Sequence, residues 1–235
     1  MGSFLNCAAY RIARKEDFMH GKSHCTSCGH DLSARDLIPV LSYISSRGRC
    51  RYCGQKVSIR YPISELICGL LYLGCFLNDG TTVLALRDII FVSCLFCISI
   101  VDMEIREIPD GGLAIAAAAW LATAYFVYDC IGQAALNVAS GLVFGAAMLF
   151  ISLAMDKILK KESLGGGDIK FFAVVGLYLG FIPTLFCIMI ACITGLLGAV
   201  VLRKKSIAFG PFIAVGTYFM LLWGQRITDW YLGLF

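Results

Sequence analysis

Apolar runs recur along this chain, and most of them approach the length that a helix needs to cross a membrane. A helix requires roughly 17–25 predominantly apolar residues to span a hydrocarbon core of roughly 30 Å. Hydrophobic residues make up 59% of the 235 residues, well above the roughly 45–50% of soluble domains. One buried core in a soluble protein does not explain so many runs that are apolar on all sides. The sequence therefore predicts an all-α polytopic membrane protein.

We expect about seven transmembrane helices. The predicted spans cover residues 62–77, 83–101, 111–128, 134–155, 169–181, 184–202 and 211–229. Several of them are short or rich in glycine, which favours tight packing of helices at small residues. Residues 2–10 are also apolar but too short to cross, so we interpret them as the tail of a first span whose beginning is missing.

Basic residues predict how these spans are oriented. Ten of the 20 lysines and arginines fall in 11–61. The alternation of seven spans places eight others on the same side, namely Arg106, Lys157, Lys160, Lys161, Lys170, Arg203, Lys204 and Lys205. The opposite side has only Arg87 and Arg226 at or near it. The positive-inside rule makes the basic side cytoplasmic, so the net charge of +4 reflects topology and requires no nucleic acid partner.

Four cysteines in the predicted cytoplasmic segment form two C-x2-C pairs. Cys25 and Cys28 make the first pair, and Cys50 and Cys53 make the second. A glycine follows each pair and permits the tight turn that lets two sulfur atoms reach one ion. Four thiolates with this spacing favour a closed structural Zn²⁺ site.

Other uses of the cysteines stay open, namely a thiol-redox pair or four free thiols. We interpret the adjacent His24 and His30 as solvated neighbours of the site rather than as ligands. Cys94 and Cys97 repeat the local spacing inside an apolar run, where cysteine behaves as a small apolar residue.

Two aspartates lie at the predicted cytoplasmic edge of the membrane. Asp102 follows one apolar run, and Asp168 opens another within the sequence GGGDIK. Ionisable residues at such a depth are functional candidates, because their burial is costly. Two carboxylates without a metal suit acid–base hydrolysis, in which an ionised one activates water and a protonated one stabilises the leaving amine. Gly165 and Gly167 would then leave room for a substrate backbone and let Asp168 move.

A simpler interpretation makes both aspartates helix-end residues. It suits Asp168, since an acidic residue is favourable at a helix N-terminus, but a negative charge after a helix opposes the dipole at Asp102. We interpret Asp110 as the N-cap of the next helix and Glu65 as a capping residue. Lys170 is then an interfacial lysine. Arg106 belongs with Glu104 and Glu107 to a solvated loop.

The chain resembles the type IV prepilin peptidases, which are membrane aspartic proteases of the G-x-G-D type. The matching stretches occur in family order and cover nearly the whole chain. They are GSFLNCAAYRI at 2–12, the paired C-x2-C motifs, IPVLSYISSRGRCRYCGQKVSIRYPISE at 38–65, DMEIREIPD at 102–110, GGGDIK at 165–170 and FGPF at 209–212. The family usually has a hydrophobic span before the GSFLN stretch and a proline soon after the YR pair, and this sequence shows neither.

The resemblance implies that Asp102 and Asp168 are catalytic. It implies removal of short basic leaders from type IV prepilins and pseudopilins at the cytoplasmic face of a bacterial inner membrane. Relatives with the cysteine tetrad often also methylate the new N-terminus with S-adenosylmethionine, so this second activity is expected, although no motif places the methyl donor. Two other functions stay open: a catalytically silent zinc-knuckle component of a secretion system, and a transporter with a carboxylate relay.

Three segments follow from these patterns. Residues 1–10 are expected to be the remnant of a first membrane helix, and 11–61 a cytoplasmic zinc-knuckle domain built on the four cysteines. Residues 62–235 are expected to form the transmembrane aspartic peptidase domain. The sequence leaves the identity of the prepilin and the oligomeric state open.

Overall fold

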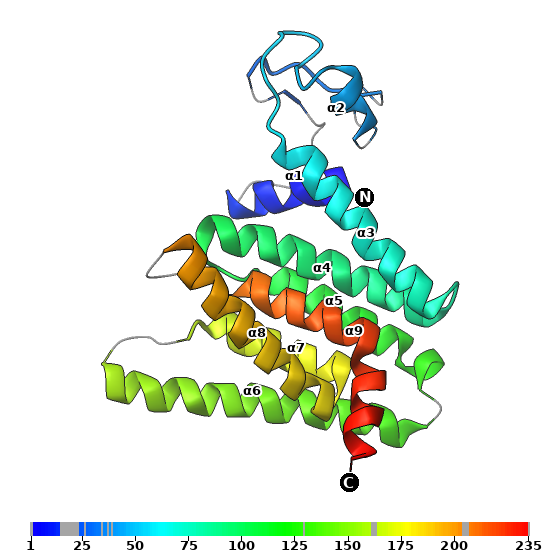
Figure 1. Ribbon diagram of the computed structural model, residues 1–235, viewed down its shortest axis with the longest axis vertical. Helices are drawn as coiled ribbons and strands as arrows, with labels where there is room; N and C mark the ends of the chain where they lie inside the picture. Colours follow the sequence, from blue (N-terminus) through cyan, green and yellow to red (C-terminus); the bar gives the residue numbers. More distant parts are fainter. Residues whose placement is uncertain are drawn as a thin grey trace. The chain divides into compact units, whose positions relative to one another are not determined.

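The structure is a computed structural model, and the residues that it describes are almost entirely helical (Figure 1). These residues are 2–14, 24–25, 27–33, 35–36, 38, 40–128, 130–160, 164–203 and 207–234. Within them the helices are α1 (Gly2–Ala13), α2 (Leu41–Ser45), α3 (Arg60–Asp79), α4 (Val83–Ile105), α5 (Asp110–Val127), α6 (Ile131–Leu159), α7 (Gly166–Leu179), α8 (Phe181–Leu202) and α9 (Gly210–Leu232). The predicted all-α class is confirmed.

Each predicted span overlaps one of the helices from α3 to α9. Five of these, α3, α4, α5, α6 and α8, are long and apolar enough to cross a membrane. The 14 residues of α7 reach only about 21 Å at 1.5 Å per residue, which is short for a hydrocarbon core. The chain is therefore a multi-pass membrane protein, while the count of seven crossings stays a prediction.

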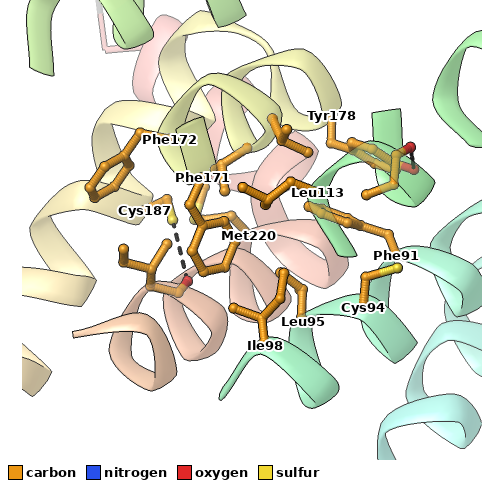
Figure 2. Close-up of a cluster of buried hydrophobic side chains, with 14 of the residues drawn as sticks. Phe91, Cys94, Leu95, Ile98, Leu113, Phe171, Phe172, Tyr178, Cys187 and Met220 are labelled. Atoms are coloured by element: carbon orange, nitrogen blue, oxygen red, sulfur yellow. Dashed lines mark hydrogen bonds between the residues drawn. The ribbon is translucent and has the colours of Figure 1, made fainter. Parts of the chain in front are cut away.

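The chain divides into two compact units, Met1–Gly74 and Cys75–Phe235. In the second unit α7 packs against α5, α6, α8 and α9, and α4 packs against α5 and α9. Aromatic and aliphatic side chains from α4, α5, α7 and α9 fill the centre, and Figure 2 shows Phe91, Leu113, Phe171 and Met220 directed toward one another. Because protein surrounds α7, this helix can be shorter than the membrane is thick.

Glycine allows α6 and α7 to approach each other closely. A Cβ atom added at Gly141 would lie 2.7 Å from the carbonyl oxygen of Ala173, and one at Gly176 would lie 2.9 Å from the Cα of Gly141. Any side chain at either position would push the helices apart. The predicted packing at small residues therefore occurs where α7 is held in place.

A buried polar cluster lies near the start of α4, far along that helix from Asp102. Arg87 and Asp88 are 5% and 4% exposed, and they form an ion pair of 2.9 Å. The Tyr128 hydroxyl oxygen accepts hydrogen bonds from Arg87, from the Trp120 indole at 3.0 Å and from Asn137 at 2.9 Å. These contacts tie α4, α5 and α6 together inside the bundle.

The predicted orientation rests partly on lysines that lie outside the described residues, namely Lys15, Lys22, Lys161, Lys204 and Lys205. Arg87 was expected at or near the opposite surface, yet it is buried beside Asp88. Its charge is therefore neutralised inside the bundle and does not report on the membrane face. Arg226 is exposed.

Candidate functional site

Asp102 lies in the last turn of α4, which continues to Ile105 instead of ending before the aspartate as the predicted span does. Its side chain is 5% exposed. The backbone N–H of Gly210, the first residue of α9, donates a hydrogen bond of 2.7 Å to Asp102 Oδ2. The first N–H groups of a helix have no partner within that helix, so the start of α9 is free to bind this carboxylate.

A side chain at Gly210, at the start of α9, would displace the Asp102 carboxylate. A Cβ atom added at Gly210 would lie 2.7 Å from Asp102 Oδ2 and 3.2 Å from its Cγ. This contact brings together residues that are 108 positions apart. Sequence reasoning gave Gly210 no role. The following proline indicates the start of a helix, but no sequence pattern indicates which group that helix end contacts.

Asp168 lies in the first turn of α7, and Gly165 is the N-cap of this helix. Gly167 packs against Ile108, since an added Cβ would lie 2.8 Å from the Cβ of that isoleucine. Gly165 and Gly167 both have ordinary backbone angles rather than positive φ values. Close packing therefore explains Gly167 in this structure, and the predicted freedom of Asp168 to move stays a prediction.

Asp102 and Asp168 come close enough to interact electrostatically. A helix N-terminus lies at each of the two aspartates. Asp168 is in the first turn of α7, and Gly210 at the start of α9 donates its hydrogen bond to the Asp102 carboxylate. The N-terminus of a helix carries a partial positive charge that favours nearby anions. The structure thus brings together the two aspartates that the sequence singled out.

An ion pair joins α5 to α7 beside these aspartates. Lys170 Nζ lies 2.8 Å from both carboxylate oxygens of Asp110. Asp110 was expected to be the N-cap of α5, but that prediction is wrong, because Pro109 occupies the N-cap and Asp110 is the first helical residue. The Asp110 carboxylate binds Lys170 on α7, and this ion pair links the start of α5 to the start of α7.

The four predicted zinc ligands lie together in the first unit. The sulfur atoms of Cys25, Cys28, Cys50 and Cys53 are all within 4.8 Å of one another, and those of Cys25 and Cys53 are 3.9 Å apart. A tetrahedral zinc with Zn–S bonds of about 2.3 Å requires sulfur atoms about 3.8 Å apart. The donor set and its spacing therefore fit Zn²⁺. Across the described part of the chain, no other group of three or more histidine, cysteine, aspartate or glutamate side chains lies close enough together to hold a metal ion.

Both C-x2-C pairs adopt the same backbone turn. The backbone N–H of Cys25 donates a hydrogen bond to the carbonyl oxygen of His30, and the backbone N–H of Cys50 donates one to the carbonyl oxygen of Gln55. The glycine after each pair has a positive φ, 70° at Gly29 and 74° at Gly54. Backbone N–H groups of Cys28 and Ser27 stabilise the Cys25 thiolate and lower the pKa of Cys25 to about 6. A thiolate is the form that binds a metal.

Neighbouring side chains support the two cysteine turns. The Asp36 carboxylate accepts hydrogen bonds from Ser33 and from the Tyr52 hydroxyl, and the Ser33 hydroxyl bond is the main reason that the pKa of Asp36 is lowered. His30 is exposed and its ring lies against that of Tyr52, with 3.7 Å between the centroids and a tilt of 34° between the planes. That His30 is a neighbour of the site rather than a ligand stays a prediction.

Glu65 does not cap α3, contrary to our expectation. The helix begins five residues earlier, at Arg60. Glu65 Oε2 instead accepts a hydrogen bond of 2.9 Å from the N–H of Val40. This contact joins α3 to the segment before α2, and a tertiary partner has replaced the expected local one.

These observations define a class of protein, a multi-pass helical membrane protein with two carboxylates at helix ends that interact electrostatically and a separate four-cysteine unit. Comparison with protein families is more specific. Residues 1–78 match the bacterial peptidase A24 N-terminal domain, and residues 89–200 match the type IV leader peptidase family. The chain belongs to the type IV leader peptidase family and is an enzyme of that family.

Similar proteins extend over nearly the whole chain. A prepilin leader peptidase/N-methyltransferase of Bacillus subtilis is 29% identical over 239 residues, which is 99% of this chain and 94% of that protein. Proteins of the same name from Aeromonas salmonicida and Burkholderia pseudomallei are each 30% identical. These matches cover 92% and 96% of this chain, and 76% and 74% of the relatives. No solved structure matches significantly.

Proposed function

We propose that this protein is a membrane aspartic endopeptidase that removes the short basic leader from type IV prepilins and pseudopilins, and that it then methylates the new N-terminus. The observation that carries the proposal is the approach of Asp102 to Asp168 inside the region similar to type IV leader peptidases. The names of the relatives support both the substrate class and the second activity.

Two carboxylates of this kind divide the work of hydrolysis. One is ionised and removes a proton from water as the oxygen attacks the scissile carbonyl carbon. The other is protonated, donates a hydrogen bond to the carbonyl oxygen, and delivers its proton to the leaving amine. Because two negative charges repel at short distance, the pair holds one proton between them near neutral pH.

Gly210 orients the Asp102 carboxylate in this mechanism. Its N–H occupies one side of Asp102 Oδ2, which limits rotation of the carboxylate and leaves Oδ1 to act on water or substrate. Gly167 lets α7 approach Ile108 and so sets the position of Asp168. S-adenosylmethionine, when bound, supplies an electrophilic methyl group for the second activity.

The proposed location is the bacterial inner membrane, with the two aspartates at the cytoplasmic face. Exposed Lys157, Lys160, Lys170 and Arg203 lie at the ends of α6 and α8 and the start of α7, as the positive-inside rule expects of cytoplasmic ends. We keep the division into 1–10, 11–61 and 62–235 as part of this proposal.

The decisive experiment measures cleavage of a co-expressed type IV prepilin by membranes that contain this protein. Asp102→Asn and Asp168→Asn should each abolish the shortening of the prepilin, because each removes one half of the acid–base pair. Asp229→Asn is the matched control, since it changes an exposed aspartate near the end of α9. Cleavage that survives in both site variants rejects the dyad.

A further inference from the structure

The start of α9 has one backbone N–H group that is free to reach Asp102. Phe209 is the N-cap of this helix, and its side chain makes no capping hydrogen bond. The Phe209 carbonyl oxygen accepts from the N–H groups of Phe212 at 3.0 Å and of Ile213 at 3.2 Å. The residue after Gly210 is a proline, which has no N–H. The Gly210 N–H is therefore the one left for the Asp102 carboxylate, and its direction depends on where α9 begins.

Two glycines of α8 receive the aromatic rings on either side of Gly210. A Cβ atom added at Gly195 would lie 3.2 Å from a ring carbon of Phe209. One added at Gly198 would lie 2.5 Å from a ring carbon of Phe212. The two glycines are three residues apart and so lie on one face of α8. Both rings therefore pack directly against the backbone of α8, and the start of α9 is held at two points.

The Phe209 ring also contacts α7, the helix that carries Asp168. Its centroid lies 6.3 Å from that of the Phe172 ring, within the roughly 4.5–7 Å of aromatic pairs. Phe172 belongs to the buried cluster of Figure 2 and is 2% exposed. It follows Asp168 by four residues, so the two side chains project from the same face of α7. The residue before Gly210 is therefore packed against the helix of the second aspartate.

We propose that Phe209 and Phe212 are positioning residues of the peptidase. By packing on the two α8 glycines, their rings hold the Gly210 N–H on the Asp102 carboxylate. The Phe209 ring also fixes this contact relative to Asp168, because it packs against α7 as well. Neither ring carries a group that transfers a proton, so each acts through the position of its neighbours. The kinetic consequence rests on the proposed peptidase function, whereas the position of Gly210 can be measured without it.

The first measurement is prepilin cleavage by the purified full-length protein in lipid nanodiscs. Phe209→Ala and Phe212→Ala should each lower kcat at least fivefold and leave KM within twofold, because the carboxylate loses its position while leader binding is unchanged. Phe219→Ala is the matched control on the same helix. Its ring is 39% exposed and lies 4.7 Å from that of Trp223, so its removal should keep kcat within twofold.

A double variant separates positioning from a general loss of packing. Gly210→Ala already disturbs the contact with Asp102, so adding Phe209→Ala to it should lower kcat by less than a further twofold. The effects of residues that act through one shared contact are not additive. Losses that multiply in the double variant, or a fall in kcat no larger than that of Phe219→Ala, refute the positioning role.

The second measurement observes the Gly210 amide itself and needs no cleavage. The chain contains two Phe–Gly pairs, at 144–145 and 209–210. Protein labelled with ¹³C at the phenylalanine carbonyl and ¹⁵N at glycine therefore gives two selected amide signals in an NMR spectrum. Asp102→Asn removes the charge of the hydrogen-bond acceptor, so the signal that it shifts is that of Gly210.

Phe212→Ala should shift the Gly210 signal toward its position in Asp102→Asn. Phe212→Leu, the milder truncation, should shift it less in the same direction, and Phe219→Ala should leave it in place. An unmoved Gly210 signal in both Phe212 variants refutes the inference even where cleavage falls. A wild-type protein that does not cleave prepilin contradicts the proposed peptidase, and a Gly210 signal that responds to Phe212 then still supports the positioning role.

Discussion

Replacement of Gly210 by alanine should slow peptide cleavage without unfolding the protein. The added Cβ would lie 2.7 Å from Asp102 Oδ2, a separation that real Cβ atoms essentially never show, so the carboxylate or the start of α9 has to move. The hydrogen bond of 2.7 Å from Gly210 to Asp102 is then weakened or lost. A hydrogen bond to a charged group contributes about 1.5–3 kcal/mol.

If that energy positions the carboxylate in the transition state, the cleavage rate should fall about ten- to hundredfold, since each factor of ten corresponds to about 1.36 kcal/mol. The assay is the rate of prepilin shortening at saturating substrate, together with KM and the melting temperature in the same detergent. We expect kcat to fall while KM and melting temperature change little, because Gly210 contacts the carboxylate rather than the leader.

Gly224→Ala is the matched control on the same helix. Its added Cβ meets only ordinary contacts, the nearest being 3.4 Å from Met220 and Pro183 side-chain atoms. Wild-type cleavage by Gly210→Ala would refute the positioning role. A loss of cleavage that comes with a large fall in melting temperature would equally contradict it, because the effect would then be on the fold.

Three further predictions concern the supports of the two units. The double variant Cys50→Ser with Cys53→Ser should lose bound zinc in metal analysis, and retention of one zinc per chain would reject the ligand set. Asp88→Ala leaves a buried guanidinium unpaired and should lower the free energy of unfolding by about 3–5 kcal/mol, so an unchanged melting temperature would contradict the buried ion pair. Asp110→Lys and Lys170→Asp should each slow cleavage, and their combination should restore it; additive losses would argue against the link between α5 and α7.

The apolar runs predict the helices well, because a chain in hydrocarbon must satisfy its backbone hydrogen bonds within each segment. Each run therefore becomes a helix, and all seven predicted spans overlap one. The runs do not reveal which helices face lipid. α7 is surrounded by other helices, and this placement depends on Gly141 and Gly176, whose effect appears only when α6 and α7 meet.

The helix-capping preferences of the sequence predicted the wrong hydrogen-bond partners for two acidic residues. Glu65 and Asp110 both stand where a capping residue is expected, and both bind groups distant in sequence, Val40 and Lys170. The same carboxylate can cap a helix or bind a group that is distant in sequence, and sequence alone does not show which of these two contacts forms. The cysteine tetrad was easier to predict, because each pair forms its turn from adjacent residues.

Asp102 lies in the last turn of its own helix, α4. The partial negative charge at the C-terminus of a helix is unfavourable for an ionised carboxylate there. The start of α9 removes this conflict, because the Gly210 N–H reaches the carboxylate and brings the positive end of a second helix to it. Asp168 does not require a second helix, because it lies at the N-terminal, partially positive end of α7. The two carboxylates therefore differ in how they are held: Asp168 depends on its own helix, whereas Asp102 depends on a helix that begins 108 residues later. An insertion that displaces the start of α9 should consequently impair Asp102 while leaving α4 and α7 folded.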